Sequence, residues 1–203
     1  MKDNVKKMLV LVMAIAMTVA LCACGSKESE EETGMANPII TVADASELTE
    51  ATGISLDAPE GATDVAYAYC QPEDGTIEFA QVTFTLDGNE FCYRAKDSGD
   101  ITEITASSDE NASTDDLMSA LENGTNIGAE LAGMNYEWKS AGTVVVQERA
   151  GVCAFNKKGP GFIAWLDVAP GFLYSLSMDD NATQDVLTDV ANKSFVPMQG
   201  EVG

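Results

Sequence analysis

The residues best suited to chemistry are five cysteines, because the chain of 203 residues contains no histidine. The lack of histidine excludes Ser-His-Asp and Cys-His nucleophiles, histidine-ligated zinc and a histidine pH switch. Cys70, Cys92 and Cys153 lie in the body of the sequence. Their number is odd, so at least one of them is a free thiol or pairs with another chain. No Cys-x-x-Cys spacing is present, which favours structural cysteines over a redox centre.

Carboxylates are the other candidate groups, since 33 acidic residues stand against 11 basic ones and the formal charge is −22. The densest acidic clusters are residues 179–181 and residues 109–111 with 115–116. Neither cluster has the spacing of an EF-hand, so we expect no metal site, with calcium binding kept as an open alternative. No pair of carboxylates stands out for glycoside hydrolysis. The negative charge also argues against a nucleic-acid partner, because phosphates require a basic surface.

Motifs for other kinds of catalysis are missing from the sequence, which has no Ser-x-x-Lys dyad, no Gly-x-Ser-x-Gly elbow and no P-loop. Gly159 and Gly161 resemble part of a dinucleotide fingerprint but precede a predicted strand, so we interpret them as a turn. Trp138 and Trp165 could stack on sugar rings, but the alternation of Trp165 with Ile163 favours packing in the core. We therefore predict a protein that is not an enzyme, with no catalytic residue and no cofactor.

The N-terminus has the layout of an export signal. Lys2, Lys6 and Lys7 precede an apolar run over residues 8–21, which is 14 residues long. A bilayer-spanning helix needs about 20 apolar residues, whereas the apolar part of a signal peptide has about 7–15. The run therefore favours a signal peptide over a membrane-spanning helix.

The end of this run resembles the lipobox of bacterial lipoproteins, with Leu21 three residues before Cys24 and the small Ala23 directly before it. Cys22 does not fit the modified position, because the preceding Leu21 is too large. The resemblance implies that residues 1–23 are removed and that Cys24 carries a thioether-linked diacylglycerol, which anchors the protein to the extracytoplasmic face of the cell membrane. An uncleaved membrane segment or an ordinary secretory signal is the alternative.

The rest of the chain divides into a tether and one domain. Residues 24–36 are rich in glutamate and almost free of large apolar side chains, which predicts an acidic flexible tether. Residues 37–203 contain the patterned elements of a single domain. Within it, residues 98–134 form a long acidic excursion in which a short helix begins at Ser113 or Thr114 and ends at residues 123–124.

Two hairpins give the domain its framework. Residues 76–95 contain Asp87 and Gly88, a two-residue turn that would place Phe84 opposite Phe91, with a bulge near residues 80–81. Residues 162–178 form a second, similar hairpin. A helix is predicted after Asp44, ended by Gly53, and another from about Asn181, with Gln184 in its first turn. We predict the α+β class, an antiparallel sheet with helices packed on one face, with the further hypothesis of two similar half-sheets.

Three stretches carry a resemblance to a family. They are NPIITVADASELTEATGISLDAPEGATDVAYAY, AQVTFTLDGNEFCYRA and FIAWLDVAPGFLYSLSMDDNATQDVLTDVA. Over residues 37–95 and 135–195 the chain resembles exported Gram-positive lipoproteins with a domain of unknown function, family four-three-six-seven. The region around residues 98–134 is longer and more acidic than the family pattern. The resemblance implies a fold and a location but no activity.

Together these observations predict a lipid-anchored, non-catalytic binding or interaction module of the cell envelope. Its partners would be the membrane, through the anchor, and a protein or small-molecule ligand. A half-barrel carrier or sensor of an apolar ligand is the alternative, and a hydrolase that uses carboxylates alone is less favoured.

Overall fold

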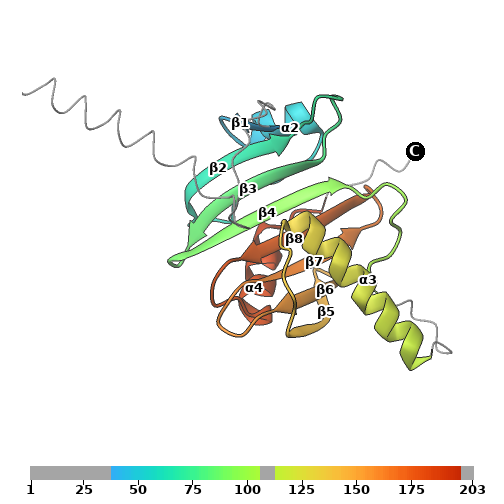
Figure 1. Ribbon diagram of the computed structural model, residues 1–203. Coiled ribbons are helices and arrows are strands. Elements are labelled where there is room, and N and C mark those ends of the chain that lie inside the picture. Colours follow the sequence, from blue (N-terminus) through green and yellow to red (C-terminus); the bar gives the residue numbers. More distant parts are fainter. Residues whose placement is uncertain (1–37, 106–112, 198–203) are drawn as a thin grey trace, which may run out of the picture. The chain divides into compact units, whose positions relative to one another are not determined.

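The computed structural model describes residues 38–105 and 113–197 (Figure 1). The predicted signal peptide, the tether and the lipobox residues Leu21, Ala23 and Cys24 lie outside the described residues. The elements in chain order are β1 (Ile39–Val42), α2 (Ala45–Thr52), β2 (Thr63–Cys70), β3 (Phe79–Leu86), β4 (Asn89–Asp97), α3 (Thr114–Ala132), β5 (Ser140–Val146), β6 (Arg149–Phe155), β7 (Gly161–Asp167), β8 (Phe172–Met178) and α4 (Gln184–Ser194).

All eight strands form one open antiparallel sheet in the order β1-β2-β3-β4-β8-β7-β6-β5 (Figure 1). The predicted α+β class is therefore confirmed. Two four-stranded meanders, β1 to β4 and β5 to β8, meet where β4 pairs with β8. This strand order agrees with the hypothesis of two similar half-sheets, and the two predicted hairpins occupy equivalent places in the two meanders.

The hairpin of β3 and β4 has the predicted register, with Phe84 opposite Phe91 and Val82 opposite Tyr93. The rings of Phe84 and Phe91 stack with centroids 5.3 Å apart. Asp87 and Gly88 both have positive φ, 51° and 78°, as a two-residue turn that matches the strand twist requires. The register predicted from these two turn residues is therefore confirmed.

The predicted bulge at residues 80–81 is wrong, because β3 and β4 pair without interruption from Ala80 to Leu86. The irregularity lies instead in β2, between Thr63 and Ala66. Residues 54–58 and 136–139, which have strand-like patterns, form no strand. Short patterns of this kind depend on finding a partner strand, which the sequence does not reveal.

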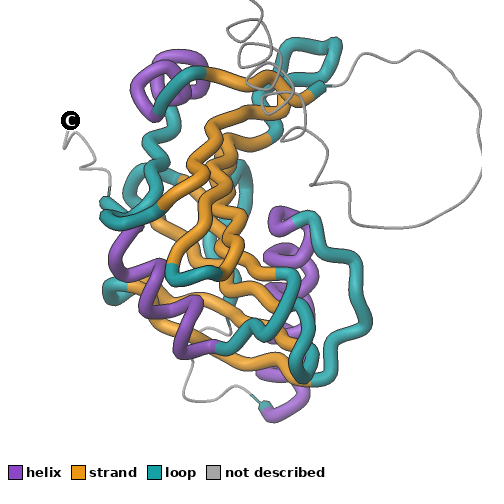
Figure 2. The backbone as a smooth tube through the Cα atoms, turned by 90° about the vertical axis from the view of Figure 1, so that its left-hand side faces the viewer, coloured by secondary structure: helices purple, strands orange, loops and turns teal. Residues whose placement is uncertain are grey.

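The helices cover both faces of the sheet, so the prediction of helices on one face is wrong (Figure 2). On β7, Ile163 and Trp165 face the core shared with α2 and α4, whereas Phe162, Ala164 and Leu166 face the core under α3. Every residue of β7 is buried. An uninterrupted apolar run of this kind is typical of a strand covered on both sides.

Helix α3 is longer than predicted. It begins as expected at a capping box, in which Ser113 and Asp116 exchange hydrogen bonds, but it continues through Gly124 to Ala132. The predicted end at residues 123–124 is wrong because Gly124 and Gly128 face the sheet, where a Cβ on Gly128 would overlap Phe162 and Ala164. Much of the acidic excursion is therefore a helix packed on the sheet.

The two other helices are close to expectation. In α2, the Asp44 side chain accepts a hydrogen bond from the Glu47 amide at 2.9 Å, and Gly53 ends the helix with a φ of 72°. Helix α4 begins at Gln184 with Thr183 as its cap, later than the predicted start at Asn181.

Candidate functional site

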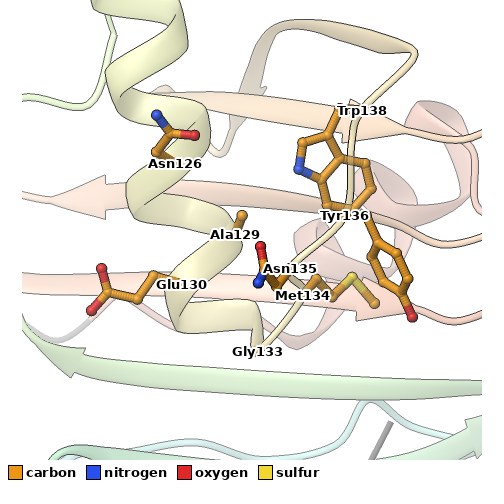
Figure 3. A pocket seen from close by; sticks show the side chains of 8 residues that line it. All are labelled: Asn126, Ala129, Glu130, Gly133, Met134, Asn135, Tyr136 and Trp138. Carbon is orange, nitrogen blue, oxygen red and sulfur yellow. The ribbon is translucent and has the colours of Figure 1, made fainter. Parts of the chain in front are cut away.

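An open groove lies beside the C-terminal half of α3 (Figure 3). Its volume is about 510 Å³, within the range of about 300–1,000 Å³ that is usual for small-molecule sites. The groove is bounded on one side by the last turns of α3 and on the other by the segment that leads from α3 to β5. The lining residues are Asn126, Ala129, Glu130, Gly133, Met134, Asn135, Tyr136 and Trp138.

The helical wall follows from the periodicity of α3. Asn126 and Glu130 are one turn apart, so both exposed side chains lie on the same side of the helix. Ala129, also in this wall, has a small side chain, which leaves space above it. The helix ends at Gly133, whose left-handed φ of 70° lets its amide bond the carbonyls of Ala129 and Glu130.

The aromatic wall is held by perpendicular ring contacts. The ring centroid of Trp138 lies 5.2 Å from that of Phe162 on β7 and 5.7 Å from that of Tyr136. Trp138 is half-buried and Tyr136 is exposed. In Figure 3 the nitrogen-bearing side of the Trp138 indole is turned toward α3. The indole is therefore fixed by the core on one side while it lines the groove on the other.

Arg94 on β4 fixes the end of α3 against the sheet. Its Nη1 donates a hydrogen bond to the Leu131 carbonyl at 3.1 Å, and its Nε donates to Gln81 at 2.8 Å. The guanidinium also lies over the Phe79 ring, 4.6 Å from the centroid. A cation at the C-terminus of a helix is favourable because the last carbonyls carry partial negative charge. A Cβ on Gly133 would overlap the end of this flexible side chain, which could shift, so glycine is required there chiefly for its φ.

The two tryptophans have different roles. Trp165 is 0% exposed and stacks on Tyr174 with centroids 5.5 Å apart, which confirms the core prediction for this residue. Trp138 packs on Phe162 and also lines the groove. The core prediction is therefore confirmed in part at Trp138, which packs against the core under α3, and sugar stacking there stays a prediction.

The cysteines contribute to packing. Cys70 and Cys153 are buried free thiols, so a bridge between Cys70 and Cys92 is excluded. The Cys70 thiol donates a hydrogen bond to Glu78 at 3.2 Å, and Cys92 lies opposite Thr83. Burial, with the hydrogen bond to Glu78, raises the pKa of Cys70 to about 11. A thiol with a raised pKa is a poor nucleophile at neutral pH.

A buried ion pair lies at the end of α4, on the face opposite the groove. Arg149 Nε is 3.2 Å from an oxygen of Asp167, whose side chain is 5% exposed. Burial raises the pKa of Tyr174 beside it, and the negative charge of Asp167 adds to the effect. Arg149 also lies over the Phe195 ring, and Gln147 Nε2 donates to the Phe195 carbonyl at 2.7 Å. These contacts hold the segment after α4 on the sheet.

Within the described ranges, no three His, Cys, Asp or Glu side chains are grouped as a metal ion would require. Residues 179–181 are among those described, whereas residues 109–111 lie outside them. In the same part of the chain, no helix is both long and apolar enough to span a bilayer.

Of the eight groove residues, the sequence analysis singled out Trp138 and missed the other seven, among them Asn126, Glu130, Asn135 and Tyr136. The periodic spacing of Asn126 and Glu130 would have indicated a shared helical side, but only for a helix continued through Gly124.

Comparison with known proteins gives no match, neither to a family model, nor to a curated protein, nor to a solved structure. The family resemblance over residues 37–95 and 135–195 stays a prediction.

Proposed function

We propose that this protein is a lipid-anchored lipoprotein on the extracytoplasmic face of the bacterial cell membrane, and that its folded domain is a non-catalytic binding module. The groove beside α3 is the observation that carries the binding role. The lipobox at Leu21, Ala23 and Cys24 supports the location.

The composition of the groove favours binding over hydrolysis. Two aromatic side chains and a few polar ones line it, which is the usual make-up of a small-molecule site. Its lining includes one carboxylate, that of Glu130, whereas hydrolysis by carboxylates alone uses a pair. The groove therefore supports recognition of a ligand more directly than its cleavage.

An internal site for an apolar ligand is the second candidate, and the packing of the α4 face gives it less support. Trp165 stacks on Tyr174, and the rings of both make perpendicular contacts with Phe195. These rings occupy the space between α4 and the sheet, where a carrier would hold its ligand.

The charge of the chain is consistent with a domain that stands away from the membrane surface. Removal of residues 1–23 would take away three lysines and one aspartate and change the formal charge from −22 to −24. Anionic lipid head groups repel such a domain, so the diacylglycerol on Cys24 would supply the membrane affinity and residues 24–36 the distance.

The anchor is tested by Cys24→Ala in a Gram-positive host. We expect the protein to lose labelling by radioactive palmitate and to leave the membrane fraction, because two acyl chains provide stable anchoring. Cys22→Ala is the matched control and should keep both the label and the membrane fraction. A Cys24→Ala protein that stays labelled and sediments with membranes would refute the proposed anchor.

A further inference from the structure

We infer that the groove beside α3 binds an uncharged saccharide chain. This inference rests on the proposed binding function and names the ligand class of the same site. It is carried by the lining of an open groove, in which two aromatic side chains, two amides and one carboxylate gather beside the last turns of α3.

The aromatic wall suits the carbon-bound face of a sugar ring. The faces of aromatic rings carry partial negative charge and attract C–H groups, which point outward from the flat sides of a pyranose. Trp138 and Tyr136 present two rings at a centroid distance of 5.7 Å and an interplanar angle of 74°. The contact of Trp138 with Phe162 fixes the indole, so little entropy of the Trp138 side chain is lost when a ligand binds.

The polar side chains of the groove suit hydroxyl groups. Each amide side chain both donates and accepts hydrogen bonds, and so does each hydroxyl of a sugar. Asn126 and Asn135 supply such amides, and Glu130 supplies acceptors. A proline-rich peptide, the rival ligand for an aromatic groove, offers few donors to these three side chains. These polar side chains therefore favour the saccharide.

The charge of the groove disfavours an anionic ligand. Of the eight lining residues, all within the described chain, Glu130 alone is charged, and the nearby Arg94 is engaged by Gln81 and Leu131. An anionic saccharide would meet Glu130 and the field of a chain with a formal charge of −22. The groove is also open to solvent rather than enclosed.

The test uses the full-length protein in a detergent without a sugar head group. Chitotriose and cellotriose are the uncharged probes, trigalacturonate is the anionic probe, and an oligoproline peptide represents the rival ligand. The chain has two tryptophans and Trp165 is 0% exposed, so a change in tryptophan emission or in acrylamide quenching reports mainly on Trp138. Calorimetric titration gives the affinity of each variant independently of this signal.

We expect at least one uncharged trisaccharide to bind saturably and to shield Trp138 from acrylamide. Tyr136→Ala should weaken binding about tenfold by removing a stacking surface, and Asn126→Ala about fivefold by removing hydrogen bonds. Asn126 is exposed on a helix, so its replacement by alanine leaves the fold intact. Val168→Ala, at an exposed residue outside the groove lining, is the control and should bind like the unmodified protein.

The inference is overturned if neither uncharged trisaccharide binds, if both groove variants bind as tightly as the control, or if trigalacturonate binds equally well. Saturable binding of oligoproline alone would overturn the saccharide while leaving the proposed binding function in place. Shortened products after incubation with a trisaccharide would instead contradict the non-catalytic part of the proposed function and leave the ligand class standing.

Discussion

At Gly124, the lack of a side chain allows α3 to lie against the loop before it. A Cβ there would overlap the carbonyl oxygen of Ile104 and come within 3.0 Å of a methyl group of Val152. Backbone atoms cannot move aside as the end of a flexible side chain can. The residue that looks like a helix terminator in the sequence is therefore the residue that allows the helix to pack.

Gly124→Ala tests this contact, because the change in stability should have the opposite sign to the one usual for a glycine in an exposed helix. In an exposed helix this change stabilises by about 1 kcal/mol, but here we expect a net loss of about 1–3 kcal/mol because the methyl group overpacks the contact. Urea unfolding monitored by circular dichroism measures the difference. Gly159→Ala is the control, since its Cβ would lie at an ordinary 3.6 Å from Asn156, and it should change stability by less than about 1 kcal/mol. Equal stability of Gly124→Ala and the original protein would contradict the packing argument.

At the scale of the element, α3 depends on its first turn. Its N-terminus carries a reciprocal capping box in which Ser113 Oγ accepts from the Asp116 amide at 3.2 Å and the Ser113 amide donates to Asp116 at 3.1 Å. The last turn is fixed by Arg94, and the groove lies beside this end. The cap therefore stabilises the start of the helix, and the groove lies beside its other end.

Ser113→Ala should destabilise the protein by about 1 kcal/mol, the usual cost of losing a capping hydroxyl. Thr114→Ala, one residue into the helix, is the control and should have little effect, because alanine is a good helix former. Hydrogen bonds from the Ser113 side chain and backbone lower the pKa of Asp116. The stability that the ionised Asp116 carboxylate contributes is therefore present above the ordinary carboxyl pKa. It is lost as the pH falls through the lowered pKa of the folded protein. Urea unfolding at pH 7 and pH 3 should show that the free energy of unfolding falls less on acidification in Ser113→Ala than in the original protein. An equal fall in both proteins would contradict the capping role.

At the scale of the whole molecule, burial on both faces of the sheet leaves several phenols and thiols that favour their neutral forms. Burial raises the pKa of Tyr93 and of Cys153, and burial with the hydrogen bond to Asp57 raises the pKa of Tyr67 to about 12. Tyr174 and Cys70 shift in the same direction. In the unfolded chain these groups ionise near the ordinary values of about 8.5 for cysteine and 10 for tyrosine.

The sign of these shifts predicts a loss of stability at alkaline pH. The stabilising contribution is complete below the unfolded pKa of each group and is lost as the pH rises through its folded pKa, so the free energy of unfolding should fall from about pH 8.5 upward. Urea unfolding at pH 7, 9.5 and 11 measures this slope. Cys70→Ala should flatten it between the unfolded value and about 11, whereas Val145→Ala, at a residue 61% exposed, should not. A stability that does not change up to pH 11 would contradict this account.

The sequence by itself determined the features that depend on neighbouring residues. Asp44 and Gly53 delimit α2, Asp87 and Gly88 set the register of a hairpin, and Ser113 starts α3, because each satisfies backbone groups or a φ angle within a few residues. Alternation along the strands also indicated the antiparallel α+β class.

The tertiary structure alone decided where α3 ends, that helices cover both faces, and that Asn126 and Glu130 line the same groove as Trp138. Each depends on contacts between residues distant in the chain, such as Gly124 with Val152 and Arg94 with Leu131. The stabilisation from such contacts comes from burial between elements, which no local pattern records.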